Sequence, residues 1–463
     1  MKRWLCGIFL LLFLNSNAQI TQKIDSAIKT MVADSQLKHA IISLLVIDSK
    51  TNKVIYRRNE QAGLAPASCQ KIITATTAFE LLGKDYTYKT TLGYDGKINN
   101  GILRGNIYII GSGDPTLGSW RYGSTKEKLI LSAFKKAISN SGIKKVDGYV
   151  LADERKWSTQ TIPDGWIWQD IGNYYGAGAS ALNWRENQYD LILKSGKKVG
   201  DSVKIVSVNP PIDAGLISEL TSAAKGSGDN AFIYLPQFAK MGFVRGTIPV
   251  NEDKFVISGA MPDPGFLLCY TFQNDLFING YRESDYELYF DTKNKIKGSP
   301  QIFYTHTSPT LDSIMYWFLK KSINLYGEAL VKTISYEKNK IGSTDDGIEV
   351  IKDFWSNRGV ERSSLKIIDG SGLSPANRVT TRALVTIMQY AKTQSWFSSF
   401  YYGLPEINGI KMKDGYINGV RSYVGYIKNK QGQEYTFSFI INNFDGSPST
   451  VREKMWKVLD LLK

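Results

Sequence analysis

Apolar positions near the start of the chain change from a helical to an alternating spacing. From Ile20 to about Gln36 they recur at helical spacing. Ala40 to Asp48 and Lys53 to Arg58 then read as strands on either side of the polar turn Ser49-Lys50-Thr51-Asn52. The pattern predicts a helix followed by a β-hairpin.

The end of the chain shows the same elements in the opposite order. Arg421 to Lys428 and Tyr435 to Asn443 form a second predicted hairpin, and an amphipathic helix runs from about Ser449 to Leu461. Helix and hairpin at the front, with hairpin and helix at the back, predict that the two ends build one α/β domain together. The middle of the chain would then be inserted into it.

The middle of the chain, residues 86–295, has many short strand-like runs and glycine-rich turns such as Gly111-Ser112-Gly113-Asp114-Pro115. This pattern predicts an inserted, mainly β region of one or two small domains. We therefore expect a signal peptide at 1–18, a main domain from 19–85 plus 296–463, and an insertion at 86–295.

The segment from Pro66 to Lys71 places a serine and a lysine three residues apart at the start of a helix. At this spacing Ser68 and Lys71 share one helical face. The residues that follow are apolar almost throughout, which predicts a buried helix. A lysine in such a helix must find partners or lose its charge, so its amine can act as the base for a serine nucleophile. Eight other Ser-x-x-Lys spacings lack this context and are expected to be solvated polar pairs.

The N-terminus has the three parts of a secretory signal. A basic Met1-Lys2-Arg3 precedes the apolar run from Trp4 to Leu14, and Ser16-Asn17-Ala18 offers small residues for cleavage before Gln19. The apolar run is too short to span a bilayer, and no later stretch is long enough. We therefore expect an exported protein of the cell envelope or periplasm, with no stable membrane span.

Composition and charge narrow the classes of function. The 463 residues are 43% hydrophobic and 22% charged, as in ordinary globular proteins, and the formal net charge is +14. In an exported protein this charge favours anionic partners such as cell-wall polymer. The basic residues are scattered without a recognised motif, so nucleic acid is not expected as a partner.

Cysteine and histidine are both scarce. Cys69 and Cys269 are expected to be free, mostly buried thiols, with a disulfide between them as the alternative. His39 and His306 are the only histidines, and neither accompanies a nucleophile elbow, so a Ser-His-Asp hydrolase is not expected. No metal site and no cofactor are predicted, and the scarcity of histidine favours a serine enzyme whose base is lysine.

Two further motifs carry candidate chemistry. Ser322 and Asn324 can both face a cleft where the backbone turns, the hydroxyl relaying a proton and the amide holding a carbonyl. The alternative is that Ser322 caps a helix. Lys413-Asp414-Gly415 can place a cation on a strand edge to bind a carboxylate, with a surface turn as the alternative.

Several segments together resemble a known family. They are Pro66-Ala67-Ser68 with Gln70-Lys71, Gly113-Asp114-Pro115-Thr116-Leu117, Gly165-Trp166-Ile167-Trp168, Gly172-Asn173-Tyr174-Tyr175-Gly176-Ala177, Ser180-Ala181-Leu182-Asn183, His306-Thr307-Ser308-Pro309 and Asp369-Gly370-Ser371-Gly372-Leu373-Ser374. Over essentially the whole mature chain the sequence resembles the D-alanyl-D-alanine carboxypeptidase/endopeptidases of the class C low-molecular-mass penicillin-binding protein type, peptidase family S13.

The resemblance implies an α+β fold, in which a transpeptidase/β-lactamase-like domain has an antiparallel sheet flanked by helices. It implies that Ser68 is the nucleophile and Lys71 its base, with Ser322 and Asn324 as second motif and Lys413 to Gly415 as third. Backbone N–H groups of Ser68 and Tyr416 would form the oxyanion hole. The expected partners are peptidoglycan stem peptides and inhibitory β-lactams. The resemblance also implies that Asp153 contacts the substrate's diamino-acid side chain.

The third motif departs from the family pattern. Asp414 stands where threonine or serine is usual, and Tyr416 stands where a small hydroxyl residue is usual. An ionised aspartate repels a substrate carboxylate unless it pairs with Lys413 or Arg421, is protonated, or points away. The leading hypothesis is a penicillin-sensitive DD-peptidase. The alternatives are a weakened homologue that binds cell wall, and a β-lactamase or esterase with the same Ser-Lys chemistry; the oligomeric state stays open.

Overall fold

The computed structural model describes residues 19–281 and 298–463, which form two compact units. The described part of unit 1 comprises residues 19–81, 315–322 and 348–463, and that of unit 2 comprises 82–281, 298–314 and 323–347. The predicted signal peptide lies outside the described residues, and the domain bounds given above stay a prediction.

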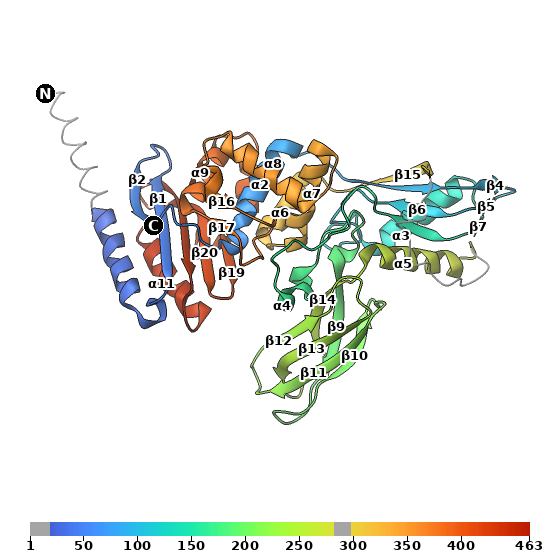
Figure 1. The fold of residues 1–463 in the computed structure, drawn as a ribbon, viewed down its shortest axis with the longest axis horizontal. Helices are drawn as coiled ribbons and strands as arrows, with labels where there is room; N and C mark the ends of the chain where they lie inside the picture. Colours follow the sequence, from blue (N-terminus) through green and yellow to red (C-terminus); the bar gives the residue numbers. More distant parts are fainter. Residues whose placement is uncertain (1–18, 282–297) are drawn as a thin grey trace. The chain divides into compact units, whose positions relative to one another are not determined.

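Unit 1 is built on a six-stranded sheet in which every neighbouring pair is antiparallel. The strands lie in the order β18-β19-β20-β21-β1-β2, so strands from the two ends of the chain pair with each other (Figure 1). Both predicted hairpins are present. The strands are β1 (Ile41–Asp48), β2 (Val54–Arg58), β18 (Glu406–Ile407), β19 (Ile410–Ile417), β20 (Val420–Lys428) and β21 (Glu434–Asn442).

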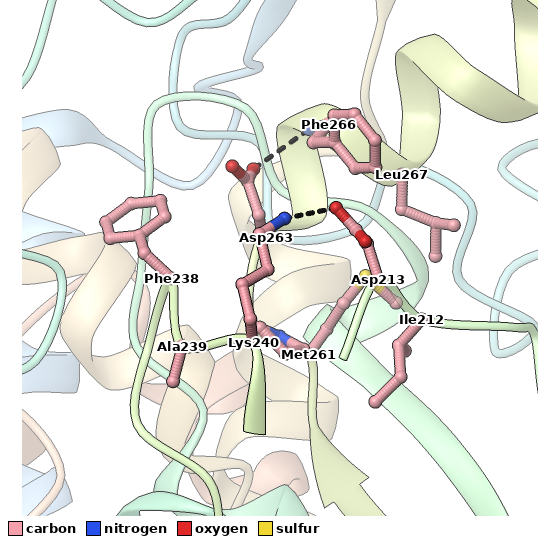
Figure 2. A pocket seen from close by; sticks show the side chains of 10 residues that line it. Ile212, Asp213, Phe238, Ala239, Lys240, Met261, Asp263, Phe266 and Leu267 are labelled. Carbon is pink, nitrogen blue, oxygen red and sulfur yellow. Dashed lines mark hydrogen bonds and ion pairs between the residues drawn. The ribbon is translucent and has the colours of Figure 1, made fainter. Parts of the chain in front are cut away.

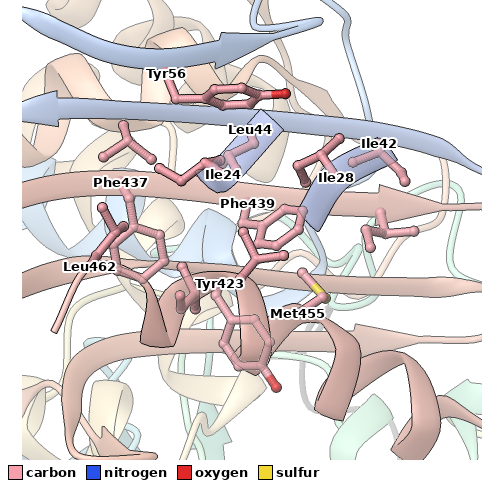
Figure 3. Close-up of a cluster of buried hydrophobic side chains, with 14 of the residues drawn as sticks. Ile24, Ile28, Ile42, Leu44, Tyr56, Tyr423, Phe437, Phe439, Met455 and Leu462 are labelled. Atoms are coloured by element: carbon pink, nitrogen blue, oxygen red, sulfur yellow. The ribbon is translucent and has the colours of Figure 1, made fainter. Parts of the chain in front are cut away.

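The two terminal helices cover one face of this sheet. Ile24 and Ile28 of the first helix, residues 19–33, and Met455 of α11 (Pro448–Asp460) are buried in the same cluster as alternate residues of β21 (Figure 3). Burying each of these side chains stabilises the fold by about 1.5–3 kcal/mol. The apolar stripes that predicted both helices are therefore the surfaces that pack on the sheet.

The other face of the sheet packs against α9 (Thr381–Lys392). Leu45 and Ile47 of β1 contact Val385 of α9, whereas Leu44 and Val46 belong to the cluster of the terminal helices. Successive strand residues point to opposite faces, so β1 is apolar on both sides because both sides are covered.

The helix that follows Ser68 lies inside unit 1. It begins as the short 3₁₀ helix η2 (Ala67–Gln70) and continues as α2 (Lys71–Leu82). Thr77 accepts a hydrogen bond from the Trp355 indole at 2.9 Å, and the Phe79 ring stacks on Trp396 at 5.1 Å. The prediction of a buried helix is confirmed. The other elements that belong wholly or mostly to unit 1 are α6 (Leu311–Lys320), α8 (Thr344–Ser356), η5 (Arg362–Ser364), β16 (Leu365–Lys366), β17 (Arg378–Val379) and α10 (Phe397–Gly403).

One part of unit 2 is a four-stranded sheet in the order β15-β3-β6-β8 with two helices. The rings of Phe134 in α3 and Phe272 in α5 lie 5.5 Å apart in its core, together with Ile107 and Ile109 of β6. The elements are β3 (Lys89–Tyr94), β4 (Lys97–Asn99), β5 (Ile102–Arg104), β6 (Ile107–Ile110), α3 (Glu127–Asn140), β7 (Lys145–Asp147), β8 (Val150–Asp153), α5 (Pro264–Ile278) and β15 (Gln301–Thr307).

The other part of unit 2 consists of two three-stranded sheets, β10-β9-β14 and β11-β13-β12. Leu191 and Leu193 of β9 share a core with Val244 of β13. The prediction of an inserted, mainly β region is confirmed for this part. The strands are β9 (Gln188–Lys194), β10 (Lys204–Asn209), β11 (Gly215–Ala223), β12 (Asn230–Tyr234), β13 (Met241–Pro249) and β14 (Phe255–Ala260); helices α4 (Trp168–Ile171) and α7 (Asn324–Asn339) also belong to unit 2. Within the described ranges, no helix combines the length and apolar character needed to cross a bilayer.

Candidate active site

Ser68 and Lys71 come together where η2 runs into α2. The Lys71 Nζ lies 2.9 Å from the Ser68 Oγ and donates to the carbonyl oxygen of Ser371 at 2.8 Å. The Lys71 side chain is fully buried. A neutral amine at this distance can accept the hydroxyl proton, so the pair has the geometry of a nucleophile and its base.

The Ser371 carbonyl is held in place by the fully buried Asp369. The two carboxylate oxygens of Asp369 accept the backbone N–H groups of Gly372 at 2.8 Å and Ser374 at 2.7 Å. The Gln70 amide donates to the Asp369 Oδ1 at 3.0 Å and also contacts its carbonyl oxygen. The loop therefore fixes the carbonyl that orients the Lys71 amine, a role that the sequence analysis did not assign.

The backbone immediately before Ser68 is strained. Ala67 has a φ of 44°, in the left-handed region, which costs an L-residue about 1–2 kcal/mol. Gly372 approaches so closely that a Cβ there would lie 1.9 Å from the Ala67 carbonyl oxygen. Because only glycine permits this approach, the loop at 369–374 helps to set the turn that presents Ser68.

β19 lies against the start of η2. A Cβ added at Gly415 would meet the Ser68 backbone nitrogen at 2.9 Å and the Ser422 Oγ at 2.3 Å. The Ser422 hydroxyl donates to the Pro66 carbonyl oxygen at 2.5 Å and so ties β20 to the same turn. Glycine at 415 is therefore required for the strand to reach the nucleophile.

The register of the β19–β20 hairpin decides which backbone groups of β19 face outward. The two-residue turn after Ile417 closes on the pair Ile417–Val420, which must therefore be hydrogen-bonded. Hydrogen-bonded and non-hydrogen-bonded pairs alternate, so the N–H groups of Asp414 and Tyr416 point away from β20. Among the described strands, β18 pairs only with Ile410 and Lys411, which leaves this part of the edge open.

Lys413 and Asp414 form an ion pair at the open edge. The fully buried Lys413 Nζ lies 2.7 Å from the Asp414 carbonyl oxygen and 3.1 Å from its Oδ1. Burial raises the pKa of the Asp414 carboxyl, but the charge and hydrogen bond of Lys413, with the charge of Arg421, outweigh it and hold the pKa below its usual range. The lowered pKa favours the ionised form of Asp414 over the protonated alternative. The alternative of a surface turn is wrong, because Lys413 to Gly415 lie within β19.

Ser322 and Asn324 lie on either side of the start of α7. Ser322 has a φ of 57°, and its buried hydroxyl has no hydrogen-bond partner in the part of the chain that the structure describes. The helix N-cap is Ile323, so the alternative that Ser322 caps the helix is wrong. Asn324 begins α7 and donates to the carbonyl oxygen of Tyr175 in unit 2 at 2.8 Å. The catalytic roles of Ser322 and Asn324 stay predictions.

Asp153 ends β8 in unit 2, where its buried carboxylate is paired with Arg155. The Arg155 Nε and Nη2 donate to its two oxygens at 2.9 and 2.7 Å. This fork-like pairing engages both carboxylate oxygens. The assignment of Asp153 to the substrate's diamino-acid side chain stays a prediction.

The neighbour of the nucleophile, Cys69, is a buried free thiol, as is Cys269, which confirms the prediction of two unpaired cysteines. Burial raises the pKa of the Cys69 thiol to about 12, and its Sγ lies 3.3 Å from the Lys413 carbonyl oxygen. A thiol that does not ionise at neutral pH is a poor nucleophile. Between these two neighbours, Ser68 rather than Cys69 is therefore the candidate nucleophile at this turn.

A cavity of about 280 Å³ in unit 2 is another place where a ligand could bind (Figure 2). Its lining includes the Asp213–Lys240 ion pair and Asp263, whose carboxylate accepts the Phe266 N–H at 2.9 Å. The other lining residues are Ile212, Phe238, Ala239, Met261, Pro262 and Leu267, so it presents no serine, threonine or cysteine nucleophile. Within residues 19–281 and 298–463 there is also no group of three His, Cys, Asp or Glu residues placed to hold a metal ion.

Comparison with curated proteins gives relatives that cover most of the chain. It is 27% identical over 481 aligned residues to the D-alanyl-D-alanine carboxypeptidase of Actinomadura sp. (strain R39), covering 95% of this chain and 84% of that protein. It is 25% identical over 417 residues to the D-alanyl-D-alanine carboxypeptidase DacB of Haemophilus influenzae, covering 85% of this chain and 83% of that protein.

A solved structure and a family model also match this chain over most of its length. The crystal structure of penicillin-binding protein 4 (DacB) from Haemophilus influenzae matches with a TM-score of 0.78 at 20% identity, covering 96% of this chain and 99% of that chain, which shows a shared fold. The sequence matches the D-Ala-D-Ala carboxypeptidase 3 (S13) family over residues 24–409 and 406–462. The chain therefore belongs to the D-Ala-D-Ala carboxypeptidase 3 (S13) family, and with it to the serine-type hydrolases.

Proposed function

We propose that this protein is an exported serine DD-peptidase that removes the terminal D-alanine of peptidoglycan stem peptides through an acyl-enzyme on Ser68. The observation that carries the proposal is the 2.9 Å contact between the Ser68 Oγ and the buried Lys71 Nζ in a chain of the S13 family. Membership of the family supplies the substrate class, and the contact supplies the chemistry.

In the proposed acylation, the Lys71 amine takes the Ser68 proton as the Oγ attacks the carbonyl carbon of the penultimate D-alanine. The N–H groups of Ser68 and Tyr416 stabilise the tetrahedral oxyanion. Support for this role comes from the close approach of the Gly415 backbone to the Ser68 nitrogen, which leaves no room for a Cβ, and from the outward direction of the Tyr416 N–H. The C–N bond then breaks, and the departing amine receives a proton.

We assign delivery of that proton to the Ser322 hydroxyl and orientation of the substrate carbonyl to the Asn324 amide. The buried Ser322 hydroxyl without a described partner supports the first assignment, because such a group is satisfied when a ligand binds. Water then attacks the acyl-enzyme, with Lys71 again as base, and releases the shortened peptide. A β-lactam acylates the same serine but leaves a stable adduct.

Residues 1–18 are the proposed secretory signal peptide, because they combine a basic start, an apolar run and a small-residue cleavage site. We infer export to the periplasm or cell envelope, with Gln19 at the new N-terminus. N-terminal sequencing of the protein from an envelope fraction is expected to begin at Gln19. A sequence that begins at Met1 would contradict export.

The second candidate function is a wall-binding homologue with weak turnover. The observation that favours it is the Lys413–Asp414 ion pair, because it cancels the charge that the third motif presents to a substrate carboxylate. A β-lactamase or esterase is distinguished from both candidates by rapid turnover of a chromogenic β-lactam. Cleavage of internal cross-links is a variant of the first proposal with the same acyl-enzyme.

The test compares release of the C-terminal alanine, D or L, from acylated peptides that end in D-Ala-D-Ala and in D-Ala-L-Ala. The purified mature protein is expected to act on the first only, and Ser68→Ala on neither. A cross-linked dimer of stem peptides, assayed in parallel, measures endopeptidase activity against carboxypeptidase activity. No cleavage of any of these substrates by the folded protein would contradict the proposal and favour the wall-binding candidate.

A further inference from the structure

The third-motif lysine of this chain is already occupied. Both contacts of the Lys413 Nζ within 3.1 Å are made to Asp414, and the Lys413 side chain has no exposed surface. At such a short range the ionised carboxylate cancels the lysine charge seen by a ligand. A substrate carboxylate therefore meets a neutral pair here, and Asp414 has no hydroxyl to donate.

Another cation on the same two strands is Arg421. It lies on β20 directly opposite Tyr416, and its Cζ is 5.6 Å from the ring centroids of both Tyr416 and Tyr423. Its Nε donates to the Tyr423 hydroxyl at 3.3 Å. In the described parts of the chain no carboxylate lies within ion-pair distance of this guanidinium, although its charge helps to lower the pKa of Asp414, so its outer nitrogens have no protein carboxylate as a direct partner.

The position of Arg421 relative to the oxyanion donor fits a substrate end. Paired residues on neighbouring strands have Cβ atoms about 4.5–5.5 Å apart, so Arg421 begins beside Tyr416, whose N–H faces the open edge. In a peptide ending in D-alanine, the terminal carboxylate is one residue, about 3.8 Å, beyond the reacting carbonyl. A guanidinium on a four-bond stem spans this offset and can bind both carboxylate oxygens.

We propose that Arg421 is the residue that binds the terminal carboxylate of the substrate, in place of the Lys413 and hydroxyl pair of the third motif, with the Tyr416 ring holding its guanidinium. This inference rests on the proposed DD-peptidase function and names the specificity-determining residue for it. Tyr416 is 48% exposed, so its ring has one face on Arg421 and still leaves surface for the substrate.

The experiment measures Arg421→Gln on two peptides that differ only in the last group, a free D-alanine carboxylate or its neutral amide. We expect kcat/KM for the free acid to fall about 10- to 100-fold, mainly through KM, because a charged hydrogen-bonded pair is lost. For the amide, kcat/KM is expected to change less than about 3-fold. Arg421→Lys is expected to restore part of the preference for the acid.

A matched control removes one positive charge from the exposed end of the same strand. Lys428→Gln is expected to leave the ratio between acid and amide unchanged, since Lys428 is exposed at the last position of β20. Equal loss on both peptides in Arg421→Gln would overturn the inference, because it would assign Arg421 a structural role. An unchanged ratio between the two peptides would overturn it as well.

Failure of the proposed function is distinguished with penicillin and its methyl ester, which lacks the carboxylate. Wild-type protein and Arg421→Gln are expected to form the ester adduct at similar rates, whereas Arg421→Gln acylates more slowly with the free acid. If the wild type forms no adduct with either compound, the proposed function fails and this inference fails with it. If both adducts form but Arg421→Gln treats acid and ester as the wild type does, only this inference fails.

Discussion

Two regions of unit 1 meet at Gly415, and they differ in how their polar groups are engaged. On one side, Lys71 is held between the Ser68 hydroxyl and the Ser371 carbonyl, within a loop whose buried Asp369 accepts backbone N–H groups. On the other side, Lys413 is paired with its own neighbour, and that neighbour is 35% exposed. The first region is a closed hydrogen-bonded network, and the second lies on an open strand edge.

The two regions would serve two different tasks, activation of the serine and binding of the substrate end. Activation of a serine needs a base at one distance and in one orientation, which a fully buried network can hold. Recognition of the substrate end needs a group that a ligand can reach, and here the family's hydroxyl is replaced by a carboxylate. On the proposed function, the nucleophile region holds the geometry that acylation needs, whereas the third motif carries an ion pair in place of a free cation and a hydroxyl.

The largest expected effect is loss of the base. Lys71→Met is expected to slow acylation by a β-lactam about 1,000-fold, because general-base catalysis contributes about 10²–10⁴. The acylation rate is measured by intact mass against time. Lys144→Met is the control: Lys144 also follows a serine by three residues, but that Ser141 hydroxyl donates to the Ile138 carbonyl at 2.7 Å. Equal rates for the two variants would contradict the assignment of Lys71.

The next effect tests the closed network itself. Asp369→Ala leaves several buried donors unsatisfied, so it is expected to lower the free energy of unfolding by about 3 kcal/mol. Urea unfolding measures this change. The control is Asp445→Ala, because Asp445 is exposed and accepts one backbone N–H, from Gly446 at 2.8 Å. If Asp369→Ala were as mild as the control, the network would not hold the loop.

The third prediction concerns Gly415, where the two regions meet, because a side chain added there would push them apart. In Gly415→Ala the new methyl group would lie 2.7 Å from the Pro66 carbonyl oxygen and 2.9 Å from the Ser68 nitrogen. Such overpacking costs about 1–3 kcal/mol, so acylation is expected to slow about 10- to 100-fold. Gly123→Ala, where nothing lies within 4 Å, is the control. An unchanged acylation rate in Gly415→Ala would show that this contact does not position Ser68.

A smaller effect is expected from restoring the usual third motif. Asp414→Thr removes the carboxylate that neutralises Lys413 and supplies a hydroxyl donor. We expect kcat/KM on peptides ending in D-Ala-D-Ala to rise several-fold, while the acylation rate with a neutral β-lactam ester stays the same. No rise on the peptides would contradict the view that Asp414, by neutralising Lys413, weakens binding of the substrate carboxylate.

The smallest effect is a dependence of stability on pH. The Asp414 pKa is held below its usual range, so its ionised form stabilises the fold above the pKa of the unfolded chain, and this contribution is lost as pH falls through the lowered pKa. Asp414→Asn is expected to lower stability at about pH 7 by no more than about 1 kcal/mol, since the pair is partly exposed. In urea unfolding at about pH 2 the two proteins should match; a persistent difference would contradict the ion pair as its cause.

The fold was predictable where the spacing of apolar residues along the chain matches the side chains that are buried in the core. Both terminal hairpins and helices follow from the spacing of residues such as Ile24, Leu44 and Phe439, because the same side chains form the core. The buried helix after Ser68 was predictable for the same reason. The association of Asn324 with unit 2 was not predictable, because it depends on contacts such as the bond to Tyr175, which is distant in sequence.

The candidate site was predictable only in part. Spacing and context identified Ser68 and Lys71, and the resemblance identified the third motif. The support from Asp369 and the close approach of Gly372 to Ala67 were missed, because they join segments about 300 residues apart. A glycine- and hydroxyl-rich string after an aspartate, Asp369-Gly370-Ser371-Gly372, was the available signal. Which cation pairs with Asp414 depends on side-chain placement at the strand edge and needed the structure.

The acyl-enzyme on Ser68 is tested by the intact mass of the mature protein and of Ser68→Ala after incubation with penicillin. We expect one stable adduct on the first, located on the peptide that contains Ser68, and none on the second. An adduct on Ser68→Ala, or none on the folded wild-type protein, would contradict the claim that the Ser68–Lys71 pair forms the acyl-enzyme.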